Sequence, residues 1–154
     1  MVGTWQQTLR PERVVMRLQA DAKAAAIREL LDVLDRAGVL GDRAEAERVV
    51  FERERMLSTG MGHGIAIPHG KTAAVNQVAV AVGLSPAGIA FEAMDGAPVR
   101  IVVLVVSPAG DAGTHLRVMA GLSRALNQPA VRDGLLAAPT PAAALAALLA
   151  GVTG

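Results

Sequence analysis

An apolar run near position 100 limits the fold of this chain more than any other stretch. Residues 99–106 read Val-Arg-Ile-Val-Val-Leu-Val-Val, with Arg100 as the single interruption. Such a β-branched run is typical of a strand covered on both faces, because neither face is suited to contact with water. A strand of this kind requires further layers on its two sides. The run therefore predicts the centre of an α/β sheet.

The rest of the chain supplies elements that surround this strand. Apolar residues at three- and four-residue steps predict helices over Ala22–Ala37, Asp42 to about Arg55, Asp111–Leu126, a short stretch near Pro129, and Thr140–Leu149. Further β-prone segments are Val14–Leu18, Ile65–Ile67, Val78–Leu84 and a short edge at Ile89–Phe91. Asp21, Asp42 and Thr140 are expected helix N-caps, and Gly38 an expected helix stop. The pattern predicts a three-layer α/β/α domain with a mixed sheet, spanning 1–154 with a core of about 13–149.

Composition excludes several classes of function. A net charge of +1 with 2% aromatic residues argues against nucleic-acid binding, which needs a clustered basic surface and stacking side chains. The absence of cysteine excludes disulfides, thiol catalysis and cysteine-ligated metals. No signal peptide is visible, and the longest apolar stretch, Ile101–Val106, is too short to cross a bilayer. We therefore expect a cytoplasmic protein that does not insert into a membrane.

One histidine stands in a restrained setting. His69 follows an apolar segment and Pro68, and Gly70 comes next, within Ser-Thr-Gly-Met-Gly-His-Gly-Ile-Ala-Ile-Pro-His-Gly-Lys over 58–71. Proline fixes its own φ, while glycine tolerates backbone angles that other residues avoid. A ring aimed by the backbone suits a nucleophilic imidazole, because orientation lowers the entropic cost of reaction. The alternative is a strand-end histidine that caps a carbonyl.

The order of three motifs identifies a family resemblance covering about Arg13 to Leu149. The chain resembles the enzyme IIA component of the bacterial phosphoenolpyruvate-dependent phosphotransferase system, in its fructose/mannitol and nitrogen-regulatory branch. The first motif consists of Arg53-Glu54, Ser58-Thr59-Gly60 and residues 64–70. The second is Met94-Asp95-Gly96-Ala97-Pro98-Val99, which leads into the apolar run and ends with Ser107-Pro108. The third is Thr114-His115-Leu116. The resemblance implies that His69 carries a phosphoryl group on Nε2, with no cofactor and no metal.

The resemblance also implies supporting residues. His115 is expected to assist His69 from the start of a helix, and Arg53 to stabilise phosphate with its planar fork of donors. Ser58 and Thr59 are expected to donate hydroxyls to a phosphoryl oxygen. Simpler interpretations are an exposed histidine in a surface helix, an arginine at a helix end, and hydroxyls that cap a turn.

Three nearby residues need separate comment. His63 occupies a position where the family often has asparagine, and the alternative of a metal site with His115 lacks the carboxylate or cysteine cluster that zinc sites usually have. Leu57 replaces what is commonly glycine, which affects the expected loop geometry. Lys71 is expected to be a solvated charge that attracts an acidic partner.

The family resemblance implies a phosphocarrier that receives its phosphoryl group from an HPr-like protein. In a sugar-transport protein the acceptor would be a cysteine of a IIB protein. In the nitrogen-regulatory branch, phosphorylation itself would control a transporter or a sensor kinase, and the chain without a fused IIB or membrane segment favours this branch. A third alternative is a IIA-like docking module that is not phosphorylated. For either phosphocarrier, His69, His115 and Arg53 should meet at one shallow pocket with apolar surroundings.

Overall fold

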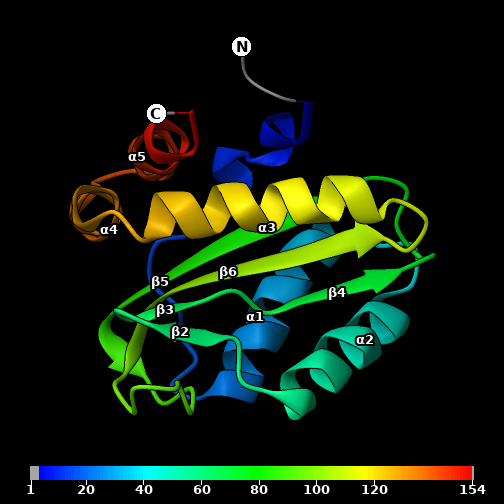
Figure 1. The fold of residues 1–154 in the computed structure, drawn as a ribbon, viewed down its shortest axis with the longest axis horizontal. Helices are drawn as coiled ribbons and strands as arrows, with labels where there is room; N and C mark the ends of the chain where they lie inside the picture. The colour runs from blue at the N-terminus through cyan, green and yellow to red at the C-terminus, as the bar shows by residue number, and fades with distance from the viewer. Residues whose placement is uncertain (1–3, 154) are drawn as a thin grey trace.

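The computed structural model describes residues 4–153, and its centre is a six-stranded mixed sheet (Figure 1). The strands are β1 (Val14–Val15), β2 (Gly60–Gly62), β3 (Ile65–Ala66), β4 (His69–Thr72), β5 (Ala79–Ile89) and β6 (Val99–Pro108). Strand β6 pairs with β5 in antiparallel direction, and with β3 and β4 in parallel direction. Strand β1 runs parallel to β5, and β2 runs antiparallel to β3. The apolar run thus forms the central strand, as predicted.

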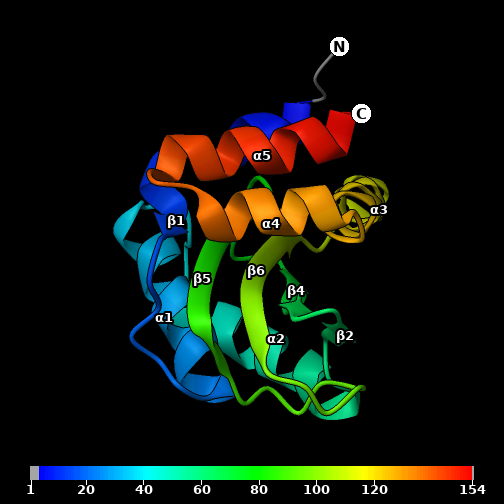
Figure 2. The ribbon, with the colours of Figure 1, turned by 90° about the vertical axis from the view of Figure 1, so that its left-hand side faces the viewer.

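Helices cover both faces of this sheet (Figure 2). They are η1 (Thr4–Thr8), η2 (Pro11–Arg13), α1 (Lys23–Arg36), α2 (Arg43–Met56), α3 (Ala112–Leu126), α4 (Pro129–Ala137) and α5 (Pro141–Thr153). Helices α1 and α2 pack on one face, while α3, α4 and α5 form the layer on the other. The predicted three-layer α/β/α arrangement is confirmed.

Strand β6 contributes to a separate apolar core on each face. Val103 and Val105 belong to the core beneath α3, α4 and α5, whereas Leu104 and Val106 belong to the core beneath α1 and α2. All four side chains are fully buried. Side chains alternate between the two faces of a strand, so a strand buried on both faces must be apolar at every position.

The first long helix does not begin with the predicted cap. Asp21 was expected to cap it, but the N-cap is Ala22, which makes no side-chain hydrogen bond to the helix. Ala22 instead forms a parallel bridge with Ala90, and the N–H of Lys23 donates to the Ala90 carbonyl over 3.2 Å. The Ala90 carbonyl at the sheet edge thus accepts the hydrogen bond that a capping side chain would otherwise accept from the start of the helix.

The other predicted helix signals are confirmed. The side chain of Asp42 accepts a hydrogen bond from the Glu45 N–H over 3.1 Å. Thr140 caps α5 in the same way, with its Oγ1 accepting from the Ala143 N–H over 3.1 Å. Gly38 follows α1 with φ of +75°, a conformation that glycine adopts without steric cost.

The expected strand over Ile65–Ile67 is shorter than predicted and is followed by another strand. Pro68 has no N–H, and β3 ends before it. The chain stays beside β6, because the Pro68 carbonyl accepts from the Val105 N–H over 3.0 Å. His69 therefore begins β4, and the expectation that it leaves the end of a strand is corrected.

Two other predicted segments merge, and two element ends move. The segment Val78–Leu84 continues to Ile89, the first residue of the predicted Ile89–Phe91 edge, in β5, and the register with β6 shifts between Leu84 and Ile89. The first strand has two residues instead of the expected Val14–Leu18, and α5 continues past the expected Leu149 to its end at residue 153.

Candidate active site

Two imidazole rings far apart in the sequence lie side by side. The ring centroids of His69 and His115 are 5.4 Å apart, and the planes are inclined by 47°. His69 begins β4 opposite Val105 of β6, and His115 lies in the first turns of α3, which follows β6 (Figure 1). The central strand therefore holds both rings, and the expectation that they lie close together is confirmed.

The ring of His69 has a defined tautomer. Its Nδ1 lies 2.8 Å from the carbonyl oxygen of Ile67. A carbonyl oxygen can only accept, so Nδ1 carries the hydrogen and donates it. The neutral ring then keeps its lone pair on Nε2. The hydrogen bond to the Ile67 carbonyl is the carbonyl-capping arrangement. It is also compatible with a nucleophilic imidazole, because Nε2 keeps its lone pair.

Both rings are held in the neutral form. Burial lowers the pKa of His69, and the charges of Arg53 and Lys71 lower it further, against opposing effects of the Ile67 hydrogen bond and the Glu54 charge. Burial also lowers the pKa of His115 to about 4, with smaller contributions from His69 and Lys71. The lowered pKa values favour the neutral imidazole, which keeps a lone pair on one ring nitrogen, at neutral pH.

His115 is buried and has a side-chain partner that the sequence interpretation did not single out. Its Nδ1 lies 2.8 Å from the hydroxyl oxygen of Ser107, and the side chain is 7% exposed. The exposed-histidine alternative is therefore wrong. The available signal was a hydroxyl residue directly after the apolar run of β6, eight positions before a histidine.

Arg53 lies near the end of α2 and is half-buried. Its Nη1 donates to the Leu57 carbonyl over 2.8 Å, and within residues 4–153 it makes no other hydrogen bond or ion pair. Most of its five N–H donors therefore remain available. Its positive charge contributes to the lowered pKa of His69, so the guanidinium is near enough to act on that ring.

Ser58 and Thr59 direct their hydroxyl groups toward the protein. The hydroxyl of Thr59 donates to Glu54 over 2.6 Å, and Thr59 is 6% exposed. The hydroxyl of Ser58 is 3.3 Å from the Phe91 carbonyl and accepts from the Gly60 N–H over 3.1 Å. This arrangement is the turn-capping alternative, and neither hydroxyl is free to donate to a phosphoryl group in this structure.

Glu54 is a second residue whose role the sequence interpretation missed. It is 5% exposed and accepts from the Thr59 N–H over 2.9 Å, in addition to the Thr59 hydroxyl. Lys23 of α1 donates to the same carboxylate over 3.2 Å. Glu54 therefore joins α1, the end of α2 and the glycine-rich segment next to the site. The signal was an acidic residue between the basic residues that end α2.

Gly70 is required for packing rather than for backbone freedom. The expectation of unusual backbone angles is wrong, since Gly70 is not among the residues with positive φ. A Cβ atom there would lie 2.8 Å from Cγ2 of Val49 and 3.0 Å from the Val50 nitrogen. Helix α2 packs directly against β4 at the residue after His69.

The surface near the site is apolar in part. Leu116 follows His115 and is 68% exposed, while Met56, the last residue of α2, and Leu57 after it are 81% and 58% exposed. Lys71 is exposed on β4, as expected of a solvated charge. His63 lies in an exposed turn with φ of 58°.

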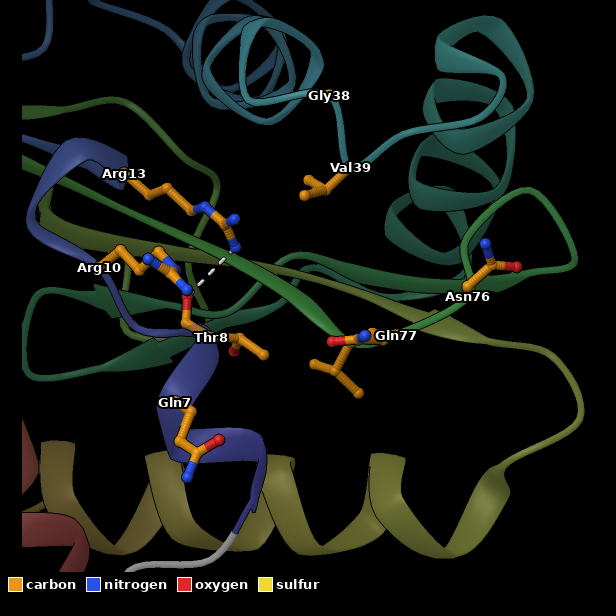
Figure 3. Close-up of a pocket in the computed structure, with 9 residues that line it drawn as sticks. Gln7, Thr8, Arg10, Arg13, Gly38, Val39, Asn76 and Gln77 are labelled. Atoms are coloured by element: carbon orange, nitrogen blue, oxygen red, sulfur yellow. Dashed lines mark hydrogen bonds between the residues drawn. The ribbon is translucent and has the colours of Figure 1, made fainter.

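Several hollows of the surface are lined by residues other than the two histidines, although one of them borders Glu54, Leu57 and Ser58. One of about 340 Å³ is bordered by Arg10, Arg13, Val39, Asn76 and Gln77 among others (Figure 3). Three more, of 360 to 610 Å³, are also lined by residues other than the two histidines. The expectation of a shallow pocket at the histidines is thus not met by these hollows.

The described residues contain neither a candidate metal centre nor a candidate membrane-spanning helix. Among residues 4–153, no group of three or more histidine, cysteine, aspartate or glutamate side chains is placed to hold a metal ion. In the same part of the chain, the helices are too short or too polar to cross a membrane.

Comparison with known proteins defines the class. Residues 7–150 match the family described as "Phosphoenolpyruvate-dependent sugar phosphotransferase system, EIIA 2". The chain belongs to this family. It is 37% identical over 132 residues to the fructose-specific EIIABC component of Bacillus subtilis, covering 86% of this chain and 21% of that protein. It therefore spans about a fifth of that relative.

Two further relatives resemble the chain over more of their length. The fructose-specific EIIA component of Haloferax volcanii is 42% identical over 116 residues, which is 75% of each chain. The crystal structure of nitrogen regulatory protein IIA-Ntr from Neisseria meningitidis superposes with a TM-score of 0.86 at 29% identity, covering 93% of this chain and 97% of that one. Both sugar-specific and nitrogen-regulatory proteins are thus relatives.

Proposed function

We propose that this protein is a phosphocarrier whose Nε2 of His69 receives a phosphoryl group from the phosphohistidine of an HPr-like protein in the cytoplasm. The observation that carries the proposal is the 2.8 Å bond between Nδ1 of His69 and the Ile67 carbonyl. This bond leaves Nε2 as the nitrogen with a lone pair and fixes the ring direction. Membership of the phosphotransferase family supports the same role.

The transfer is a single displacement at phosphorus. A bond forms between Nε2 of His69 and phosphorus while the nitrogen–phosphorus bond of the donor breaks, and its electron pair returns to the donor ring. The donor ring, protonated on its other nitrogen, leaves as neutral imidazole. Phosphorylated His69 keeps its Nδ1 proton, which the Ile67 carbonyl continues to accept.

Two neighbours are suited to the oxygens of the phosphoryl group in transit. Arg53 has donors that make no bond within the described residues, and its charge already acts on His69. The ring centroids of His115 and His69 are 5.4 Å apart, so the oxygens of a phosphoryl group on His69 would lie within reach of the His115 ring. Catalysis of phosphoryl transfer depends mainly on such positioning and charge stabilisation.

Two acceptors fit this chemistry. The TM-score of 0.86 with a IIA-Ntr protein favours a nitrogen-regulatory role, in which the phosphorylation state controls a transporter or a sensor kinase. Identity of 42% with a fructose-specific EIIA component favours transfer to a cysteine of a IIB protein. We place the regulatory role first, because that structural match covers nearly the whole of both chains.

The direct test is incubation with phosphoenolpyruvate, enzyme I and an HPr-type carrier, followed by measurement of the intact mass. We expect a gain of one phosphoryl group in the wild type and in His63→Asn, which changes an exposed histidine outside the pair. We expect no gain in His69→Ala. An unchanged wild-type mass under these conditions would support the docking-module alternative and overturn the proposal.

A second experiment separates the two acceptors. The phosphorylated protein is mixed with a IIB domain of the fructose type, and the phosphoryl content of both proteins is followed over time. Rapid loss from His69 with gain on the IIB cysteine would assign the sugar-transport role. Retention of the phosphoryl group would leave the regulatory role.

A further inference from the structure

Ser107 is a buried hydroxyl residue that directly follows the apolar residues 101–106 of β6. It lies in β6, is 0% exposed, and pairs in register with Lys71 of β4. Its hydroxyl oxygen is 2.8 Å from Nδ1 of His115. A buried hydroxyl is retained at little cost only when its hydrogen has an acceptor.

The direction of this hydrogen bond follows from an account of donors and acceptors. Within residues 4–153, the ring of His115 is the hydrogen-bond partner of the Ser107 hydroxyl. If Nδ1 of His115 carried the hydrogen, it would donate to Ser107, and the hydroxyl hydrogen would be left buried without an acceptor. If Ser107 donates to Nδ1, the buried hydroxyl hydrogen has an acceptor, and Nε2 carries the ring hydrogen. The second arrangement is therefore the stable one.

We propose that Ser107 is a positioning residue that donates to Nδ1 of His115 and thereby holds the ring hydrogen on Nε2, where it can donate to a phosphoryl oxygen on His69. The inference rests on the proposed phosphocarrier function of His69. It assigns opposite tautomers to the two rings: His69 carries its hydrogen on Nδ1, and His115 carries it on Nε2. One ring presents a lone pair to phosphorus, while the other presents a donor to the oxygens.

The electrostatics of the site support this division. Burial keeps His115 neutral, and a neutral donor stabilises the phosphoryl oxygens without adding a second full positive charge beside Arg53. A carrier must release its phosphoryl group as well as accept it. A neutral hydrogen bond is weaker than one from a charged donor, which suits transfer in both directions.

The test uses the full-length protein labelled with nitrogen-15, and long-range proton–nitrogen correlation spectra of the imidazoles. In the wild type we expect the His115 hydrogen on Nε2 and the His69 hydrogen on Nδ1. In Ser107→Ala we expect the His115 hydrogen to distribute over both nitrogens, with the His69 tautomer unchanged. The matched control is Ser85→Ala, which removes a buried hydroxyl from β5 and should leave both rings as they are.

A kinetic measurement completes the test. The rate of phosphorylation by an HPr-type carrier should fall about tenfold in Ser107→Ala, the usual effect of one lost hydrogen bond in a transition state, and Ser107→Thr should restore it. A wild-type His115 with its hydrogen on Nδ1, or a Ser107→Ala protein with unchanged tautomer and rate, would overturn the proposal. Failure of His69 phosphorylation in every protein would instead overturn the phosphocarrier function, since the tautomer measurement needs no phosphoryl donor.

Discussion

Glu54 binds Thr59 with both of its carboxylate oxygens, one to the main-chain N–H and one to the hydroxyl. The two residues lie on either side of the turn that leads from α2 to β2. Because Arg53 is the neighbour of Glu54, this contact also fixes the end of the helix that presents the arginine to His69. The arrangement links stability to the geometry of the site.

Replacement of Glu54 should therefore destabilise the fold. Glu54→Ala leaves the donors of Thr59 and Lys23 without their buried acceptor, and we expect a loss of about 2–3 kcal/mol in the free energy of unfolding. Urea unfolding measures this loss. Glu52→Ala, which breaks an exposed pair with Arg48, is the control and should cost less than about 1 kcal/mol. Equal effects of the two substitutions would contradict the role of Glu54.

Replacement of Gly70 should act through packing. Gly70→Ala places a methyl group against Val49 and the backbone of Val50, so we expect a loss of about 1–3 kcal/mol in stability. Thermal and urea unfolding measure the change. Gly110→Ala is the matched control, because a Cβ atom there meets no other atom within 4 Å. A Gly70→Ala protein as stable as this control would show that α2 does not pack closely on β4.

The phosphoryl group should be bound through nitrogen. His69→Ala should fold normally and remain unphosphorylated, because the proposal gives the chain a single nucleophile. The label on the wild type should be lost in acid and kept in alkali, as a phosphoramidate is, which is measured by mass after brief incubation at each pH. A label with the reverse stability, or a labelled His69→Ala protein, would exclude the assignment.

The His115→Ala protein should retain phosphorylation at a lower rate. Loss of a positioned donor costs about 10²–10⁴-fold in catalysed steps, and we expect a decrease toward the lower end because Arg53 remains. Quenched-flow measurement of both forward and reverse transfer tests this. Rates equal to those of the wild type in both directions would remove His115 from the site.

The buried His115 should make stability depend on pH. Its pKa in the folded protein is lowered to about 4, so the unfolded chain, with an ordinary value of about 6.5, binds the proton more readily. Stability from this residue is therefore complete above about pH 6.5 and is lost as the pH falls toward 4. We expect about 2–3 kcal/mol, measured as the difference in urea unfolding between the wild type and His115→Gln from pH 7 to pH 4. A constant difference across this range would contradict the burial of the ring.

The sequence predicts the layers of this fold better than its short strands. The apolar run of β6 and the helical periodicities can be recognised in the sequence, because buried strands and helix faces require apolar residues at these positions. Residues 69–72, His-Gly-Lys-Thr, have no β pattern and form β4 because β6 offers them paired backbone groups. The helix start at Ala22 likewise depends on a sheet edge that lies distant in sequence.

The site shows the same division between local and long-range information. The family motifs point to His69, His115 and Arg53, and the structure brings these three to one region. The contacts of Glu54 with Thr59, and of Ser107 with His115, depend on which side chains meet after folding. For Ser58 and Thr59, residue type allowed two interpretations, and only the position of their acceptors distinguishes them.

Strand β6 supports each part of the histidine pair: it pairs with β4, contains Ser107 and leads into α3. The residues of the site are thus held by the central strand, and the backbone of such a buried strand opens least often. Addition of a phosphoryl group is therefore expected to change the charge of one surface patch while leaving its contour as it was. A partner protein that distinguishes the phosphorylated from the unphosphorylated form would respond to the difference in electrostatic potential. We expect hydrogen exchange in β6 to be slow in both forms.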